Sequence, residues 1–290
     1  MKLCSVMLAG LVAASLPAAA ETVKIGEILT LSGSDATPGL QIDRGLKLYL
    51  KEHAKELPAG TTIELVTRDD TGPNPDVAKR LAQELVTREH IQLLIGAVYT
   101  PNAAAIAPIV TEAKIPFIIA NAAGVSIPRL SPYIVRVSFT LWQTAYPLGQ
   151  WAAKRGAKKG YSVITDYAPG HDAENGFAAG FTEAGGAMLG STSFPLGNLN
   201  FTPYLQRMVD AKPDTAYIFV PVGDAVTMMR AVAALNLPAA GITLVSTMDL
   251  VPDEQLPDMG DSTLGLITSG NYSAVGKRPQ NEEFVAAWKR

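Results

Sequence analysis

QLLIGAVYTPNAAAIAPIVTEAKIPFIIANAA (residues 92–123) holds two short apolar runs with a longer helical stretch between them. Residues 92–98 and 116–120 are apolar runs of strand length, which predicts two buried strands. Residues 101–113 are predicted to form a helix, and Pro101 fits its first position because a proline needs no amide hydrogen there. A strand, a helix of more than ten residues and a second strand predict a parallel βαβ unit.

The same alternation continues on both sides of this unit. Further strands are predicted at 23–29, 63–67, 134–137, 160–165, 188–194, 215–220, 243–247 and 264–269. Further helices are predicted at 40–56, 74–89, 141–155, 173–184, 202–211, 224–235 and 282–290. Repeated strand–helix units predict an α/β fold built on parallel sheets. A chain of 290 residues has room for two such domains or for one large one.

The first twenty residues predict export. Met1-Lys2 gives a positive start, residues 3–16 are apolar, and the small residues 18–20 precede Glu21. This pattern predicts a secretory signal peptide cleaved after Ala20, and hence a soluble periplasmic protein. The alternative is a membrane anchor, but the apolar run is shorter than the ~20 residues of a membrane span and Pro17 interrupts it. The one cysteine, Cys4, lies at the wrong end of this run for a lipoprotein.

Composition excludes several functional classes. The formal net charge is −3 and no basic block occurs, which argues against a nucleic-acid partner. A single cysteine excludes a disulfide framework, and His53, His90 and His171 lie far apart, so no metal site is expected. The first strand is not followed by a G-x-G-x-x-G motif, and Walker and G-x-S-x-G motifs are absent, so no cofactor and no catalytic residue is expected. His171 with Asp166 or Asp172 is the one acid–base candidate, and a solvent-exposed loop histidine is the preferred interpretation.

The segments that follow the predicted strands suit binding better than catalysis. Ligands of open α/β sheets lie beyond the carboxyl ends of the strands. These segments are rich in Gly, Ser, Thr, Asn and Pro and poor in catalytic side chains: 32–38, 69–73, 99–102, 121–124, 166–172, 221–223 and 248–250. We therefore expect a small-molecule ligand at this edge.

Five stretches in the same order resemble a known family. They are VKIGEILTLSGSDATPGLQIDRGLKL (23–48), ELVTRDDTGPNPDVAKRLAQELV (64–86), IGAVYTPNAAAIAPIVTEAKIPFIIANAA (95–123), DYAPGHDAENGFAAGF (166–181) and KPDTAYIFVPVGDAVTMMRA (212–231). From residue 22 to the end, the chain resembles the leucine/isoleucine/valine-binding family of type I periplasmic binding proteins. The resemblance implies two lobes, each a mostly parallel sheet flanked by helices, that close over a ligand. Its partners would be an inner-membrane ABC permease and the ATPase of that permease.

The resemblance also implies a division of the chain. Residues 21–138 and 264–290 are expected in lobe one, and residues 139–263 in lobe two. Family members continue well beyond the helix predicted at 282–290, so a truncated chain is expected.

The resemblance implies an anion site at the hydroxyl of Thr100, with the amides of Asn102 and Ala103 at the start of the following helix. Helix N-termini favour negative charge. The alternative role for Thr100 is that of a helix cap. The second contact segment would be Asn121, Ala122 and Ala123, although relatives often carry a hydroxyl where Ala123 stands.

The remaining contacts implied by the resemblance come mainly from lobe two. Tyr167, Gly170 and Pro221 would line the site, and Asp249 would hold a ligand ammonium, unless Met248 occupies that position. Tyr99 or Trp142 would supply an aromatic wall, and a buried structural role for Trp142 is equally open.

The ligand expected by default is a branched-chain amino acid. The missing hydroxyl at Ala123 and the aromatic residues of the strand-end segments leave an aromatic carboxylate as the alternative. An amide or ligand sensor on the same fold is a third possibility, which the signal peptide disfavours because such a regulator would stay in the cytoplasm.

Overall fold

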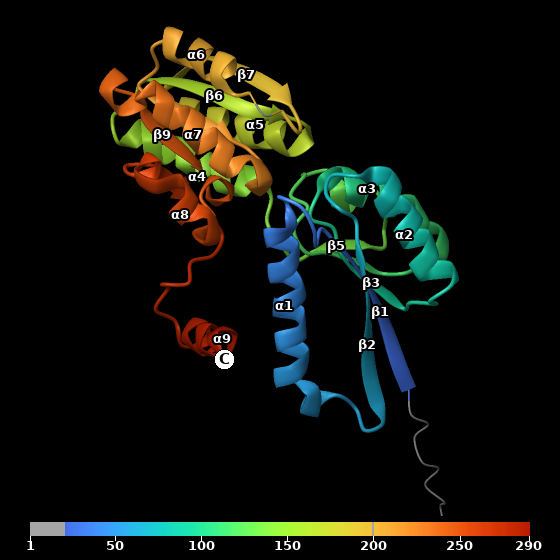
Figure 1. The fold of residues 1–290 in the computed structure, drawn as a ribbon. Helices are drawn as coiled ribbons and strands as arrows, with labels where there is room; N and C mark the ends of the chain where they lie inside the picture. Colours follow the sequence, from blue (N-terminus) through green and yellow to red (C-terminus); the bar gives the residue numbers. More distant parts are fainter. Residues whose placement is uncertain (1–20, 199) are drawn as a thin grey trace, which may run out of the picture.

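The computed structural model describes residues 21–198 and 200–290, so the predicted signal peptide lies outside the described residues. Two five-stranded sheets form two lobes, and every recorded strand pair is parallel. Helices flank each sheet (Figure 1). The predicted α/β architecture of two lobes is confirmed.

The first sheet has the strand order β2-β1-β3-β4-β5. Its strands are β1 (Glu21–Leu29), β2 (Thr61–Asp69), β3 (Leu93–Gly96), β4 (Phe117–Ile119) and β5 (Ile134–Arg136). Its helices are α1 (Ala36–Glu52), α2 (Pro75–Thr87) and α3 (Thr100–Ala113). The apolar core of this lobe lies between the sheet and the pair α2 and α3, while α1 lies on the opposite side (Figure 1).

The second sheet has the order β10-β9-β8-β6-β7. Its strands are β6 (Lys159–Asp166), β7 (Ala187–Pro195), β8 (Thr215–Phe219), β9 (Thr243–Thr247) and β10 (Ile267–Ser269). Its helices are α4 (Leu141–Lys154), α5 (Ala168–Glu183), α6 (Thr202–Asp210), α7 (Ala225–Leu235) and the short α8 (Leu256–Met259). One apolar cluster joins the sheet to α4 and α5, and another joins it to α6 and α7.

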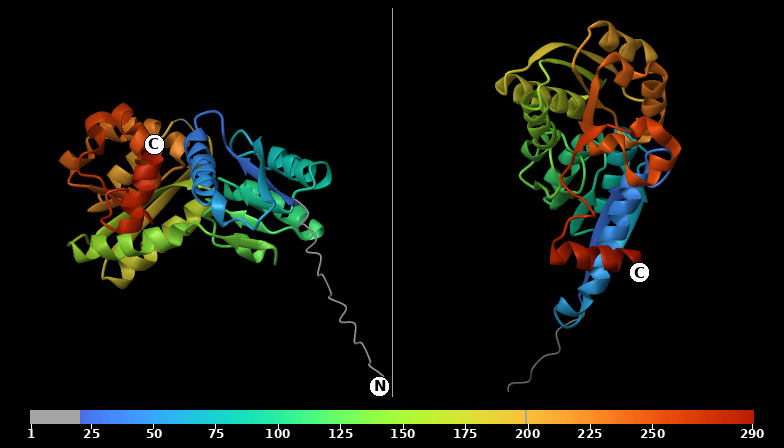
Figure 2. Two further views of the ribbon diagram at one scale, coloured as in Figure 1. Left: turned by 90° about the horizontal axis from the view of Figure 1, so that it is seen from below. Right: turned by 90° about the vertical axis from the view of Figure 1, so that its left-hand side faces the viewer.

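The predicted return to lobe one at residue 264 needs a correction. Ile267, Thr268 and Ser269 pair in parallel with Val245, Ser246 and Thr247 of β9, so β10 extends the second sheet. The chain comes back beside α1 only with α9 (Pro279–Lys289), where the Arg44 guanidinium lies 4.3 Å from the Trp288 ring centroid. The two further views of Figure 2 also place this last helix next to α1.

Both lobes repeat one topology. Counted within its own lobe, each sheet has the strand order 2-1-3-4-5. In such sheets the loops after strands 1 and 3 leave on opposite faces, which opens a crevice at the carboxyl ends of the strands. The two halves of the chain therefore share one sheet topology. The crevices of the two lobes face each other.

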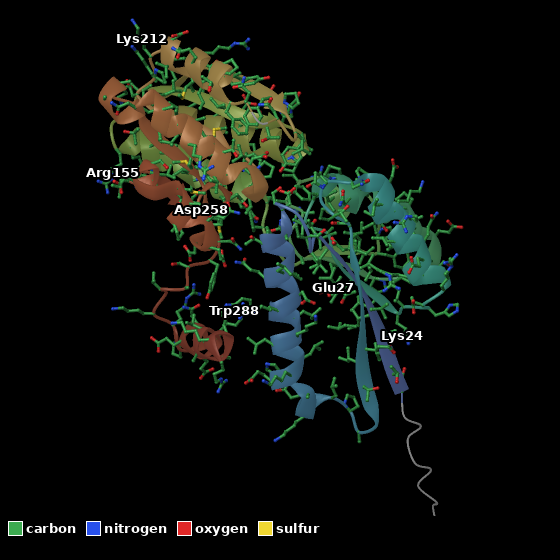
Figure 3. All side chains as sticks on the ribbon, in the orientation of Figure 1. Lys24, Glu27, Arg155, Lys212, Asp258 and Trp288 are labelled. Carbon is green, nitrogen blue, oxygen red and sulfur yellow. The ribbon has the colours of Figure 1, made fainter. Side chains whose placement is uncertain are left out.

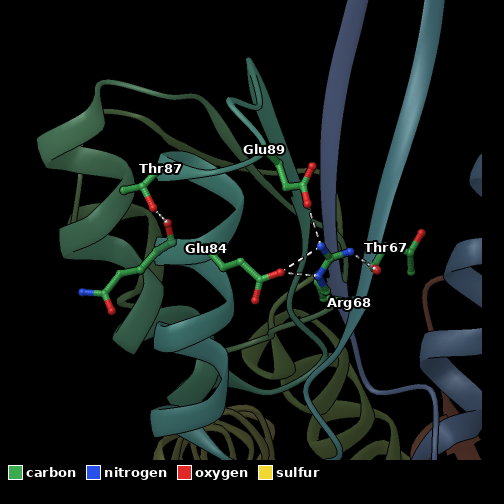
Figure 4. Close-up of polar contacts among 6 residues, drawn as sticks. Thr67, Arg68, Glu84, Thr87 and Glu89 are labelled. Carbon is green, nitrogen blue, oxygen red and sulfur yellow. Dashed lines mark hydrogen bonds and ion pairs between the residues drawn. The ribbon is translucent and has the colours of Figure 1, made fainter.

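Ion pairs tie β2 to the end of α2 (Figure 4). Arg68 Nε donates to Glu84 Oε1 at 2.9 Å, and Arg68 Nη2 donates to Glu89 Oε1 at 2.9 Å. These side chains are part-buried and still reach solvent, which screens the pairs, so we assign the pairs a positioning role for α2 and not a large share of stability. Among the described residues, no helix combines the length and apolar character that crossing a membrane requires.

Candidate functional site

A cleft of about 1390 Å³ lies between the two lobes. It is lined by residues that follow the strands of both sheets. Of the predicted site residues, seven line it: Tyr99, Thr100, Asn121, Ala123, Tyr167, Pro221 and Asp249. The other four, Asn102, Ala103, Ala122 and Gly170, lie behind its surface and are treated below.

Thr100 is the first residue of α3 and is only 6% exposed. The N-cap residue of this helix is Tyr99, and no side-chain cap bond is made, so Thr100 is not a cap. Its Oγ1 accepts a hydrogen bond from the Gly124 amide at 3.1 Å. Because a hydroxyl has one donor and two acceptor positions, the hydrogen of Thr100 stays free to donate into the cleft.

The Asn102 side chain and the Ala103 amide do not present donors to the cleft. The Asn102 side chain is fully buried, and its Nδ2 donates to Asp70 Oδ2 at 2.7 Å and to the Gly72 carbonyl at 2.8 Å. The Ala103 amide donates to the Tyr99 carbonyl at 3.1 Å, and its side chain packs in the core of lobe one. The predicted role of the Ala103 amide is therefore wrong, because the helix itself uses that amide.

The segment after β4 supplies a different donor. The Ala122 amide donates to the Ala97 carbonyl at 3.0 Å, which turns this residue into the core. Asn121 lines the cleft while its Nδ2 donates to the Val98 carbonyl at 3.0 Å. Within residues 21–198 and 200–290, the Ala123 amide has no acceptor. The Ala123 amide and the Thr100 hydroxyl are thus two donors at one end of the cleft.

Arg136 of β5 holds the segment after β4 in place. Its Nη1 donates to the Gly124 carbonyl at 2.6 Å and to the Ala122 carbonyl at 3.4 Å. Burial lowers the pKa of Arg136, and the nearby Asp172 carboxylate opposes that change. A guanidinium this close also adds positive potential on the side of the cleft where the two donors lie.

The start of α5 differs from the predicted loop at 166–172. The helix begins at Ala168, with Tyr167 as its N-cap residue and Pro169 in its first turn. A Cβ atom on Gly170 would overlap the Thr165 carbonyl oxygen, so this glycine lets α5 pack against the end of β6. Gly170 therefore serves packing, whereas the Tyr167 ring faces the cleft and stacks on Phe219 with centroids 6.1 Å apart.

Asp249 lies in a short 3₁₀ turn (Met248–Leu250) after β9, and Met248 lines the cleft beside it. Thr247 Oγ1 donates to Asp249 Oδ2 at 2.9 Å. Burial raises the pKa of Asp249, and this hydrogen bond opposes the rise. The cleft thus has donors at the Thr100 end and an acidic group contributed by lobe two.

Sequence reasoning missed part of the apolar lining. Phe139, Leu141 and Phe219 face the cleft, and nothing in their local sequence separates them from core residues. Trp142 is 40% exposed and does not line the cleft; it stacks with Tyr146 at 6.1 Å, so neither role considered for it is correct. His171 Nε2 lies 2.8 Å from Asp166 Oδ1 in an exposed hydrogen bond. In the described chain, no recorded contact of His171 involves a nucleophilic hydroxyl or thiol.

A family model described as periplasmic binding protein matches residues 22–290. The chain belongs to the periplasmic binding protein family. The resemblance drawn from the sequence is therefore confirmed. Membership identifies the chain as a solute-binding protein of ABC transporters, and the family is not an enzyme family.

Similar proteins agree with this assignment. Leu/Ile/Val-binding protein homolog 6 of Brucella melitensis is 39% identical over 267 residues, which cover 92% of this chain and 68% of that protein. A solute-binding protein from R. palustris, solved in complex with 4-hydroxybenzoate, is 39% identical with a TM-score of 0.89, covering 93% of this chain and 73% of that one. A protein from Rhodopseudomonas palustris BisB5, in complex with 3,4-dihydroxy benzoic acid, is 44% identical with a TM-score of 0.86, covering 92% and 73%.

Proposed function

We propose that this periplasmic binding protein delivers a hydroxylated aromatic carboxylate to an ABC importer and binds it between its two lobes. The observation that carries this proposal is a pair of free donors at one end of an aromatic cleft. These donors are the hydroxyl of Thr100 and the amide of Ala123. The inner-membrane permease and its ATPase are the proposed partners. The chain is proposed to reach the periplasm through a cleaved signal peptide.

The carboxylate is proposed to bind at the Thr100 end. A hydroxyl hydrogen and an amide hydrogen can each donate to one carboxylate oxygen, and such charge-assisted bonds are the stronger kind. The start of α3 adds the positive end of a helix dipole. Arg136 adds a positive charge behind the Gly124 carbonyl without using its own donors on the ligand.

The rest of the ligand is proposed to lie between aromatic rings. Tyr99 from lobe one, and Phe139, Tyr167 and Phe219 beside the core of lobe two, line the cleft. An aromatic ligand gains about 0.5–1.5 kcal/mol per favourable ring pair beyond the burial of its area. A flat ring therefore suits these walls better than a short branched aliphatic chain.

Asp249 is proposed to bind a ring hydroxyl. Its carboxylate accepts a hydrogen bond from Thr247 and keeps further acceptor positions. The solved structures that are 39% and 44% identical to this chain carry hydroxylated aromatic acids, whereas one that is 30% identical carries benzoate. This supports an aromatic carboxylate as the ligand over a branched-chain amino acid.

A branched-chain amino acid is the second candidate. Asp249 is also a suitable partner for an ammonium group, and the curated relative from Brucella melitensis is named a Leu/Ile/Val-binding protein homolog. The two candidates differ in where the positive or donor group of the ligand lies. An ammonium sits one carbon from the carboxylate, whereas a para hydroxyl lies across the ring.

A panel of thermal shifts tests the proposal. We expect 4-hydroxybenzoate and 3,4-dihydroxybenzoate to raise the melting temperature, because a ligand at 100 times its Kd stabilises the folded state by about 2.7 kcal/mol. Benzoate, which lacks the hydroxyl, should give a smaller shift at equal concentration. The ligand should be recovered chemically unchanged. Shifts with leucine, isoleucine or valine but none with the aromatic acids would reverse the assignment.

A further inference from the structure

Asp35, in the loop that leads into α1, makes a contact between the lobes outside the ligand cleft. It occupies the N-cap position of α1 but makes no side-chain cap bond, although aspartate is among the preferred capping residues. Its carboxylate lies instead against Gly223 of lobe two. A methyl group on Gly223 would overlap Asp35 Oδ1 and lie 2.7 Å from Asp35 Cγ. The absence of a side chain at Gly223 therefore permits this approach of the two lobes.

Asp224, the next residue, brings a second carboxylate to the same place. It is the N-cap residue of α7 and likewise makes no side-chain cap bond. Burial raises the pKa of Asp224 to about 6, and the charge of Asp35 adds to the rise. Figure 1 shows the start of α1 reaching the second lobe at this point.

The other titratable groups that face this pair are phenols and carboxyls. The hydroxyl of Tyr99 lies near both Asp35 and Asp224, and so does the hydroxyl of Tyr167, which also faces Asp249. On the lobe-one side, the end of β2 adds Asp69 and Asp70, which hydrogen bonds within lobe one hold in place. Two carboxylates brought together from opposite lobes repel each other unless one of them carries a proton.

We propose that docking of Asp35 onto Gly223 is the contact that closes the lobes, and that closure favours a proton on Asp224. The inference rests on the proposed binding of a ligand between closing lobes, and it adds a regulation of that site. None of Asp35, Gly223 and Asp224 lines the cleft, so they act on closure and not on the ligand. They are positioning residues.

The sign of the pH effect follows from this arrangement. Burial raises the pKa of Asp224 to about 6, and closure is the step that brings the charge of Asp35 against it and raises it further. The closed form therefore holds more protons, and acidification favours closure. Between pH 8 and pH 5.5, ligand binding should tighten by up to roughly fourfold, the limit reached when the whole shift arises on closure.

The distance between spin labels on the two lobes tests the closing contact without a ligand. Labels are placed at Lys79→Cys on α2 and Gln206→Cys on α6, both exposed, in the full chain carrying Cys4→Ser. We expect the short-distance population of the ligand-free protein to grow from pH 8 to pH 5.5. Asp224→Asn should abolish this growth. An identical distance distribution at both pH values would overturn the proton link.

Three variants test the docking itself. Gly223→Ala should reduce the short-distance population and weaken binding of 4-hydroxybenzoate at least fivefold. The φ angle of Gly223 is not in the left-handed region, so alanine fits its backbone and the clash with Asp35 is the specific effect. In an Asp35→Ala background, Gly223→Ala should change neither the short-distance population nor the affinity for 4-hydroxybenzoate, because the clashing carboxylate is gone. The proposal would be overturned if Gly223→Ala left the affinity unchanged. It would also be overturned if Gly223→Ala weakened binding as much in the Asp35→Ala background as in the wild type.

The label distances show whether the closing contact or the ligand assignment has failed. If 4-hydroxybenzoate fails to bind while the pH-dependent closure and its rescue pattern remain, the ligand assignment fails and the closing contact stands. If 4-hydroxybenzoate binds with a Kd that is the same at pH 5.5 and pH 8 and is unaffected by Gly223→Ala, the ligand assignment stands and the closing contact fails.

Discussion

Thr100 illustrates how one side chain can serve structure and binding together. Its oxygen accepts from the Gly124 amide, and its hydrogen is free for the ligand. Thr100→Val keeps the shape and removes both roles. We expect the affinity for 4-hydroxybenzoate to fall roughly 10- to 100-fold, because a hydrogen bond to a charged group contributes about 1.5–3 kcal/mol. Binding should weaken and not vanish, because the Ala123 amide remains.

Thr100→Ser is the matched control for this prediction. Serine keeps the oxygen and its hydrogen, so affinity should stay near that of the wild type. Thr100→Val also leaves the Gly124 amide without its acceptor, and a loss of about 1 kcal/mol in unfolding free energy should accompany the lost affinity. Calorimetry and thermal melts on both variants separate the two effects. A stability loss with unchanged affinity would show that Thr100 only positions Gly124.

Glu27 of β1 is a buried carboxyl away from the cleft, labelled in Figure 3. Burial raises its pKa to about 7, Asp43 of α1 adds to the rise, and the hydrogen bond from Thr67 Oγ1 opposes it. The folded chain therefore keeps a proton on Glu27 that the unfolded chain loses near pH 4.5. The unfolding free energy should fall as pH rises from about 4.5 to about 7.

Glu27→Gln should remove this pH dependence. At pH 8 the variant should be more stable than the wild type by an amount on the order of 2 kcal/mol, because no charge has to be buried. Urea unfolding at pH 5 and pH 8 measures the difference. Glu64 on the neighbouring strand is exposed, so Glu64→Gln is the control and should leave the pH dependence of the unfolding free energy unchanged. An equal stability gap between Glu27→Gln and wild type at both pH values would contradict the assignment.

At the scale of elements, α4 and α5 pack with their backbones close together. A Cβ atom on Gly180 of α5 would overlap the Tyr146 carbonyl oxygen and lie 2.9 Å from the carbonyl carbon. Glycine to alanine inside a helix normally stabilises it by up to about 1 kcal/mol. Here we expect Gly180→Ala to destabilise the protein by about 1–3 kcal/mol, because overpacking outweighs the helix propensity. Urea unfolding measures the change.

Gly45 of α1 is the matched control for Gly180. A Cβ atom there meets nothing closer than 4.0 Å, so Gly45→Ala should be neutral or stabilising by up to about 1 kcal/mol. If both alanine variants stabilise the protein to the same extent, α4 and α5 do not pack as described.

Apolar periodicity and proline positions predicted every strand of both sheets and all the helices except the short α8. The errors lie where local signals conflict with tertiary contacts. Pro169 and Gly170 suggest a loop, yet proline suits the first turn of α5 and the glycine is required by the Thr165 carbonyl. The anion donors were partly misassigned, because the use of the Ala103 amide by its own helix appears only once the helix is known to begin at Thr100.

At the scale of the whole molecule, two sheets of the same topology place their strand ends around one cleft. Seven residues implied by the family resemblance line that cleft, and all of them lie in the strand-end segments that local patterns predict. It did not predict that β10 joins the second sheet or that Asp35 reaches Gly223, because both depend on contacts between distant segments. Contacts of this kind leave no signal in a local window of sequence.

The central claim is that an aromatic carboxylate binds between the lobes with its carboxylate at Thr100. A crystal structure of the protein with 4-hydroxybenzoate tests it most directly. We predict a carboxylate oxygen within about 3 Å of Thr100 Oγ1 and of the Ala123 amide nitrogen, with the ring hydroxyl directed toward Asp249. An empty cleft at saturating ligand, or a ligand whose carboxylate points to lobe two, would contradict the account.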